Sequence, residues 1–274
     1  MKGNIFIRFP GGRSKALTFS YDDGVQQDIR LAGIFKKYRM KATFNINSGT
    51  LGSTSGNRLT PEQVEVLYTP DLFEVACHTY THPFLEKCDS AVALSEVLYD
   101  RREIEKLFGR EAHGMAYPYG TYSDEVIDIC RTAGIYYSRT TQSHTTFQLP
   151  SEWLTWHPTC HHTNPKLFEL ADKMLSSEPG VRQDPWLFYV WGHSYEFDRH
   201  NNWARIEEFC EKMSGKDDIW YATNMDIYRY CRSFSRLKYS ADGKIIYNPT
   251  ADELWFTEAD GKMYSIKPGE TVKR

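Results

Sequence analysis

Short apolar runs alternate with longer amphipathic segments along most of this chain. The runs are rich in β-branched and aromatic residues and are bounded by turn residues, which is typical of buried strands. We expect strands at 16–20, 41–47, 73–77, 114–117, 135–139, 153–156, 187–191 and 219–222. The segments between them place apolar residues at helical spacing, and we expect helices at 28–38, from 61 onward, and at 90–107, 123–133, 164–175 and 203–213.

The alternation of strands and helices predicts an α/β fold with parallel strands and helical crossovers. Residues capable of chemistry follow the expected strands: Asp22, Asp23, His78, His82, Tyr119, Arg139 and His193. The carboxyl ends of the strands form the face on which barrel enzymes carry their active sites. This distribution favours a barrel, and a doubly wound open sheet is the alternative.

The last part of the chain follows another pattern. Asp242-Gly243 and Asp260-Gly261 each lie between strand-like runs, and Asp-Gly in that setting is a strong hairpin signal. We therefore expect a barrel over residues 1–236 and a small β appendage over residues 237–274. So short a segment cannot enclose a core of its own, so it must pack on the barrel, on a partner chain or on a ligand.

Composition excludes some classes of function. Hydrophobic residues make up 41% of the 274 residues and charged residues 25%, as in ordinary globular proteins. The net charge of -3 offers no basic surface to nucleic acid or acidic membranes. The first ten residues lack a signal-peptide pattern, and no run is long enough to span a membrane. Six scattered cysteines without a C-x-x-C pair favour free thiols. These features predict a cytoplasmic protein, and the oligomeric state stays open.

Two short segments carry the candidate chemistry. Asp22-Asp23-Gly24 directly follows one apolar run, and His78 and His82 follow another. Alone, the first is most often an exposed turn and the second a polar helix surface. Together, two imidazoles and one carboxylate are the ligand set of a catalytic Zn²⁺, and an adjacent carboxylate can act as a base on water. The pair of segments predicts a metal-dependent hydrolase.

The order of these segments resembles the polysaccharide deacetylase family, whose domain is also called the NodB homology domain. Residues 117–120 (Tyr-Pro-Tyr-Gly) and the run 187–191 followed by Gly192-His193 are similar to two further motifs of that family. The resemblance covers roughly residues 14–230. It implies a distorted (β/α) barrel of about seven strands that removes N- or O-linked acetyl groups from a carbohydrate with a divalent metal, for which we expect Zn²⁺.

The resemblance also implies roles for individual residues. The implied metal ligands are Asp23, His78 and His82. Asp22 is the implied catalytic base, the backbone N–H of Tyr119 helps to hold the oxyanion, and His193 is the implied general acid for the leaving group.

The chain departs from the family pattern at the residue that should pair with the base. The family's third motif begins with an arginine, whereas Met115 or Ala116 stands at that position here. Arg139, which follows the expected strand 135–139, is the candidate replacement, because a cation beside Asp22 would favour its carboxylate form. A scaffold role for Arg139 is the alternative.

A second departure concerns the general acid. The family's acidic-tryptophan segment is not recognisable in residues 153–162, so the partner of His193 is open between Glu196 and Asp198. His157, His161 and His162 suggest a second polar cluster at the barrel mouth, by substrate contact or by simple loop composition.

Three other functions compete with a metal-dependent carbohydrate deacetylase acting on an acetylated saccharide. One is hydrolysis of another C–N bond, such as a cyclic amide, on the same fold. Another is a non-catalytic barrel that binds glycan, and the third is a structural interaction protein. The combination of candidate ligands, base and acid argues against the second, and the third has no use for these residues.

Overall fold

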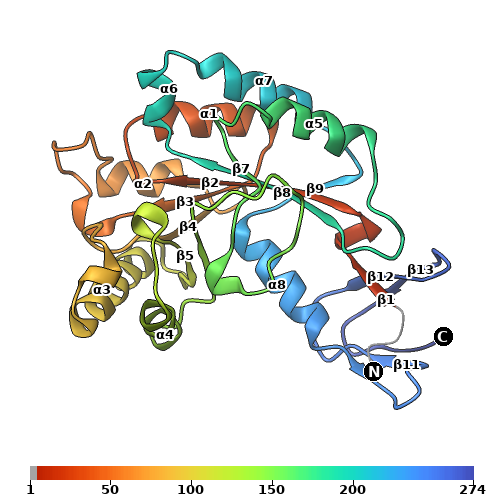
Figure 1. Ribbon diagram of the computed structural model, residues 1–274. Helices are drawn as coiled ribbons and strands as arrows, with labels where there is room; N and C mark the ends of the chain where they lie inside the picture. The colour runs from red at the N-terminus through yellow and green to blue at the C-terminus, as the bar shows by residue number, and fades with distance from the viewer. Residues whose placement is uncertain (1–4) are drawn as a thin grey trace.

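The computed structural model describes residues 5–274, and its centre is a curled sheet of eight strands (Figure 1). The strands are β2 (Lys15–Asp22), β3 (Ala42–Ile46), β4 (Phe73–Cys77), β5 (Gly114–Ala116), β6 (Tyr137–Arg139), β7 (Cys160–His161), β8 (Trp186–Gly192) and β9 (Ile219–Tyr221). Their order is β6-β5-β4-β3-β2-β8-β7, every pairing is parallel, and β9 pairs with the start of β2. A parallel bridge between Arg139 and Trp156 links the outer strand β6 to the chain that leads into β7. The distorted (β/α) barrel predicted from the sequence is confirmed.

Strand β2 shows how the sequence builds both faces of this sheet. Successive side chains of a strand point to opposite faces, and the large apolar residues Leu17, Phe19 and Tyr21 all join the cluster that packs under the helices. The alternate positions are small or polar, and Thr18 bonds there to Asn224 at 2.9 Å. Asp22 is the last residue on that inner face. The alternation therefore carries a carboxylate to the carboxyl end of the barrel interior.

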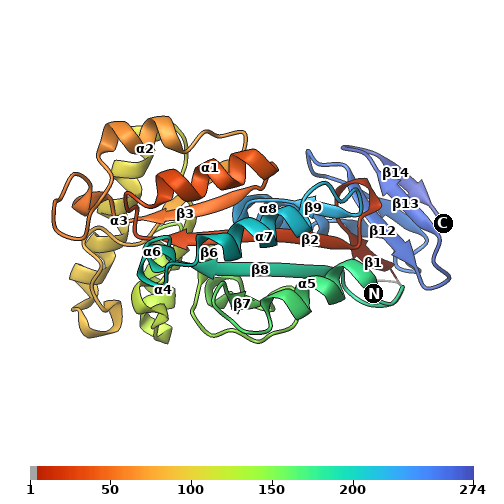
Figure 2. The same ribbon diagram turned by 90° about the horizontal axis from the view of Figure 1, so that it is seen from above.

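Helices cover the outside of the sheet, except for α8 (Asn224–Ser235), which packs with Ala16, Leu187 and Tyr189 on the other face (Figures 1 and 2). They are α1 (Asp28–Tyr38), α2 (Pro61–Leu67), α3 (Ser90–Phe108), α4 (Asp124–Thr132), α5 (Leu167–Ser176), α6 (Tyr195–Arg199), α7 (Trp203–Met213) and α8 (Asn224–Ser235). Every expected helix is present. The sequence analysis did not identify α6 or α8, although Thr223 and Asp226 form a capping box at the start of α8, which is a recognisable helix start.

The strand expected at 153–156 is wrong. Trp153–Thr155 form a 3₁₀ turn, and the strand of this region is the short β7 a few residues later. The indole rings of Trp153 and Trp156 lie 4.9 Å apart, and Trp153 also packs on Tyr228 of α8 at 5.2 Å. Aromatic packing buries this apolar run, and Trp156 at its end pairs with β6 through a single bridge.

Both expected C-terminal hairpins form, within two small antiparallel sheets. Their strands are β1 (Ile5–Arg8), β10 (Lys238–Tyr239), β11 (Ile245–Tyr247), β12 (Leu254–Glu258), β13 (Met263–Ile266) and β14 (Thr271–Lys273). The sheet orders are β1-β12-β13 and β10-β11-β14. The N-terminal strand β1 thus joins the C-terminal appendage.

The appendage packs on the amino-terminal end of the barrel. Ile246, Leu254 and Phe256 are buried in one cluster with Ala16 and Leu187, which lie near the starts of β2 and β8. Figure 2 shows the small sheets at the end of the molecule opposite α2, α3 and α6. The appendage therefore closes the bottom of the barrel, away from the end where β2 reaches Asp22.

Within residues 5–274, no helix combines the length and apolar character needed to cross a bilayer. Residues 1–4, which belong to the segment considered for an export signal, lie outside the described residues.

Candidate active site

Asp23 leaves strand β2 in a left-handed conformation, with φ of 86°. Such a backbone is uncommon for a residue with a side chain and often marks a functional position. Asp22 stays on the inner face of the strand while Asp23 turns to the rim, so the two adjacent carboxylates meet different surroundings. Arg58 lies 3.3 Å from Asp23 Oδ1 and also donates a hydrogen bond to the Asp23 carbonyl.

His78 follows β4 and is held from two sides. Its Nδ1 contacts the carbonyl oxygen of Ala116 at 2.7 Å, and its backbone N–H donates to Asp100 Oδ2 at 2.8 Å. A proton on Nδ1 leaves Nε2 free as a ligand. Burial is the largest influence on the pKa of His78 and lowers it, which favours the neutral imidazole that metals bind.

His82 reaches the same place through a loop rather than a helix. Thr79 and His82 have φ of 66° each, so the chain between the two histidines turns back on itself. The rings of His78 and His82 lie 4.7 Å apart. Burial and the neighbouring His78 lower the pKa of His82 to about 4, so this ring is also neutral at pH 7.

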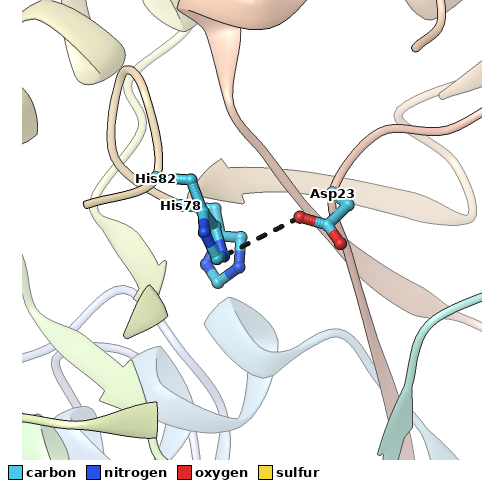
Figure 3. Close-up of side chains that lie close together, drawn as sticks. All are labelled: Asp23, His78 and His82. Carbon is cyan, nitrogen blue, oxygen red and sulfur yellow. Dashed lines mark ion pairs between the residues drawn. The ribbon is translucent and has the colours of Figure 1, made fainter. Parts of the chain in front are cut away.

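The three predicted ligands converge, as Figure 3 shows for both imidazoles and the carboxylate. Their ligand atoms lie within 4.8 Å of one another, and His82 Nε2 is 3.9 Å from Asp23 Oδ1. The buried Asp23 Oδ1 has no hydrogen-bond partner in the part of the chain that the structure describes. Two neutral imidazoles and a carboxylate oxygen that pairs with Arg58 but accepts no hydrogen bond among residues 5–274 fit a divalent metal such as Zn²⁺.

Asp22 and Arg139 form a buried ion pair, and the planar guanidinium donates from Nη2 to Asp22 Oδ2. Arg139 stands in register with Ala116 on the neighbouring strand, so its side chain enters the barrel beside the position where the family's arginine was expected. Asn45 donates to the other oxygen of Asp22 at 2.8 Å. Burial alone would raise the pKa of Asp22, but nearby positive charge, first of all Arg139, outweighs it and lowers the pKa.

His193 follows β8 and faces Asp22 across the barrel mouth, with Nε2 3.8 Å from Asp22 Oδ2. On its other side, Glu196 Oε2 lies 3.5 Å from Nδ1 and accepts from the His193 backbone N–H at 3.2 Å. Burial alone would lower the pKa of His193, but Glu196 and Asp22 outweigh it and raise the pKa. Asp198, the other candidate partner, instead accepts from Trp203 Nε1 at 2.7 Å.

Tyr119 lies beside the ligand set in a left-handed conformation, with φ of 58°. Its ring stacks on Phe84 at 3.7 Å, lies 4.5 Å from the ring of His82, and is half exposed. The structure thus brings all seven predicted site residues to one end of the barrel.

The three further histidines divide into two places. His161 and His162 both face Glu196, with Nε2 atoms 3.0 and 3.4 Å from Oε2. His157 instead contacts Thr140 Oγ1 at 2.6 Å. Burial lowers the pKa of His162 well below its ordinary value, so this ring is neutral.

Sequence analysis missed three residues that support the site: Asn45, Arg58 and Asp100. Asp100 had a signal, because it shares the buried face of α3 with Ala93, Val97 and Ile104, where a charge is unexpected. Asn45 alternates with apolar residues in β3. Arg58 lies in an irregular loop, where no pattern points to it.

An α/β barrel with a cluster of ionisable groups at the carboxyl ends of its strands is the architecture of a barrel enzyme. The model of the polysaccharide deacetylase family matches residues 10–138. This stretch contains the Asp-Asp-Gly and His-x-x-x-His segments, and the resemblance to the polysaccharide deacetylase family is confirmed.

A relative of this chain also has a deacetylase name. A poly-β-1,6-N-acetyl-D-glucosamine N-deacetylase from Staphylococcus epidermidis is 27% identical over 120 residues, which cover 40% of this chain and 42% of that protein. The chain thus spans less than half of this relative's length.

Two crystal structures show the same fold. A candidate polysaccharide deacetylase from Mycobacterium smegmatis has a TM-score of 0.60 at 17% identity, over 84% of this chain and 94% of that one. A family 4 carbohydrate esterase from Streptomyces lividans, in complex with acetate, has a TM-score of 0.50 at 15% identity, over 77% and 93%.

Proposed function

We propose that this protein hydrolyses acetyl groups from a carbohydrate, and that N-acetylated glucosamine polymers are the first substrates to test. One observation carries the proposal: an ionised carboxylate and an imidazole with a raised pKa lie 3.8 Å apart, beside three convergent metal ligands. Groups whose surroundings push their pKa values apart are the usual sign of a base and an acid. The name of the staphylococcal relative supports the choice of substrate.

Asp23, His78 and His82 would hold a divalent metal, for which we propose Zn²⁺. When bound, such an ion lowers the pKa of water and polarises the acetyl carbonyl. Asp22 then accepts the proton of the attacking water, and Arg139 keeps this carboxylate ionised beforehand. The backbone N–H of Tyr119 helps to hold the carbonyl oxygen as negative charge develops on it.

His193 donates a proton to the leaving nitrogen, because an amine leaves poorly unless it is protonated. Glu196 positions the imidazole and raises its pKa, which favours the charged form that can donate a proton. Water and the amide are thereby converted to acetate and a free amine.

The exposed ring of Tyr119, backed by Phe84, offers a flat apolar surface next to the proposed ligands. Aromatic faces of this kind suit the apolar face of a pyranose ring. The ring is placed to orient a saccharide whose acetyl group reaches Asp22.

The test measures acetate released by the purified chain from β-1,6- and β-1,4-linked N-acetylglucosamine oligomers, with Zn²⁺ supplied and Asp22→Asn as the control. We expect acetate from the wild type and almost none from the variant. Opening of a cyclic amide without acetate release would instead favour another C–N hydrolase. Oligomer binding without turnover would favour a glycan-binding barrel. The cytoplasmic location stays a prediction, to be tested by cell fractionation.

A further inference from the structure

We propose that His161, His162 and Glu196 form a second divalent-metal site on the carboxyl rim of the barrel. His161 is the last residue of β7, His162 follows it, and Glu196 lies in the first turn of α6 after β8. The proposal goes beyond the proposed function, which gives these residues no metal.

The distances suit ligands of one ion. The Nε2 atoms of His161 and His162 approach the same Glu196 oxygen at 3.0 and 3.4 Å. Zn²⁺ binds nitrogen and oxygen at about 2.0–2.2 Å, so the ligands of a tetrahedral ion lie about 3.3 Å apart. All three ligand atoms lie within 4.8 Å of one another, as in the group around Asp23.

The second histidine supplies an independent observation. His162 is only 1% exposed, and among residues 5–274 neither of its ring nitrogens has a hydrogen-bond partner. Its Nε2 faces Glu196, but the two groups are not aligned as a hydrogen bond. A buried polar atom without a partner is costly, and a cation held between the three side chains would remove that cost at Nε2.

The surroundings hold these side chains in place. The ring of His162 is stacked on Tyr21 at 5.7 Å and on Phe197 at 4.2 Å. A side chain at Gly192 would place its Cβ 2.0 Å from His162 Nδ1, so this ring can lie here only beside a glycine. His161 is oriented by a contact of 2.7 Å between its Nδ1 and Thr163 Oγ1. Metal ligands are typically held in orientation by neighbouring side chains that do not bind the metal themselves.

The charge of the cluster also suits a cation. In the described part of the chain, Glu196 makes ion pairs with histidines alone and with no arginine or lysine. Arg205, the nearby cation, donates to the His162 and Asn164 carbonyls rather than to Glu196. The carboxylate is therefore not neutralised by a permanent positive charge.

Occupancy of this site has a consequence for the proposed function, on which this step rests. Glu196 also faces Nδ1 of His193 at 3.5 Å. A cation bound to Glu196 would engage the carboxylate oxygen that lies beside His193 and so withdraw the group that positions this ring. Metal in excess of one ion per chain should therefore inhibit acetate release.

The main test counts Zn²⁺ per chain after the full-length protein is stripped of metal and dialysed against buffered Zn²⁺. We expect two ions in the wild type and one in His161→Gln. His157→Gln is the matched control and should keep both, because His157 contacts Thr140 outside the cluster. A folded His161→Gln that holds as many ions as the wild type would overturn the proposal. Glu196→Gln serves as the second variant if circular dichroism shows that His161→Gln misfolds.

His78→Gln separates this proposal from the proposed function, because it should lose the other ion and keep the one at His161. If instead His161→Gln loses an ion and His78→Gln loses none, the second site stands and the metal of the proposed function fails. The inhibition is tested by adding a second equivalent of Zn²⁺, which should slow the wild type roughly tenfold or more and leave the rate of His161→Gln unchanged. Equal inhibition of both would overturn the link to Glu196.

Discussion

Two groups of two histidines and one carboxylate lie on the same rim of this barrel, and they differ in what surrounds the carboxylate. Next to Asp23 stands a second carboxylate, Asp22, which is ionised by Arg139 and free to accept a proton. Glu196 makes ion pairs only with imidazoles among residues 5–274. We therefore propose chemistry at the first group and, at most, metal binding at the second. A base beside the ligands, rather than the ligands themselves, distinguishes a hydrolytic site.

Removal of one histidine from each group should give the largest difference in activity between the two groups. His78→Ala is expected to lower acetate release about 10⁴-fold or more, because several kcal/mol of transition-state stabilisation depend on the metal. His161→Ala is the matched variant in the other group and should retain most activity. Rates and circular dichroism of both purified variants provide the measurement. Equal loss in the two folded variants would contradict the difference that we draw between the groups.

Asp22→Asn sharpens the comparison by removing the base while the ligands stay. The amide is nearly isosteric but cannot take up a proton, so kcat should fall about 10²–10⁴-fold. Bound metal, measured by mass spectrometry of the digested protein, should equal that of the wild type. A normal kcat would exclude Asp22 as the base.

Arg139→Ala tests whether that base depends on its buried cation. Without Arg139, burial dominates and the pKa of Asp22 should rise. The carboxylate form is lost as pH falls through this pKa, so the acidic limb of the pH–rate profile should move to higher pH. An unchanged limb in a folded variant would show that Arg139 does not act on Asp22.

Glu196→Gln tests whether the proposed general acid, His193, depends on the Glu196 carboxylate. Loss of this carboxylate should lower the pKa of His193, because burial then has less opposition. Activity needs the protonated imidazole, which is lost as pH rises through the pKa, so the alkaline limb should move to lower pH. Asp198→Asn is the control and should leave the limb in place, since Asp198 bonds to Trp203. A shift of the alkaline limb of equal size in both variants would show that Glu196 has no specific effect on the pKa of His193.

The smallest effect on activity is expected from the far end of the molecule. Phe256→Ala removes a fully buried ring from the appendage and should cost about 3–5 kcal/mol of unfolding free energy. Because the appendage closes the opposite end of the barrel, kcat/KM per folded molecule should stay normal. Denaturant unfolding and initial rates measure the two quantities, and a large loss of kcat/KM with unchanged stability would place the appendage in substrate binding.

The sequence predicted the barrel because alternation and turn residues are local signals. The same alternation placed Asp22 on the inner face of β2, and the order of motifs pointed to Asp23, His78 and His82, whose side chains lie close together. The short strand β7 was not predicted because two residues are too few to show an alternating pattern. The apolar run that begins at Trp153 was taken for a strand, but its rings pack on other aromatic rings instead.

Partners across the barrel were harder to predict. Arg58 approaches Asp23 from an irregular loop, and the cluster around Glu196 joins residues 161 and 162 to residue 196. These contacts depend on where β7 and β8 end in space, which no local pattern encodes. The pairing of Arg139 with Asp22 could be predicted only because the family arginine was missing and Arg139 stands at the end of an expected strand.

Anomalous diffraction at the zinc absorption edge tests the central claim most directly. Crystals of the Zn²⁺-loaded protein should show a strong peak among Asp23, His78 and His82, with Asp22 outside bonding distance of the ion. A map with no peak at these three residues, in crystals whose zinc content is established by fluorescence, would contradict the account of the catalytic site.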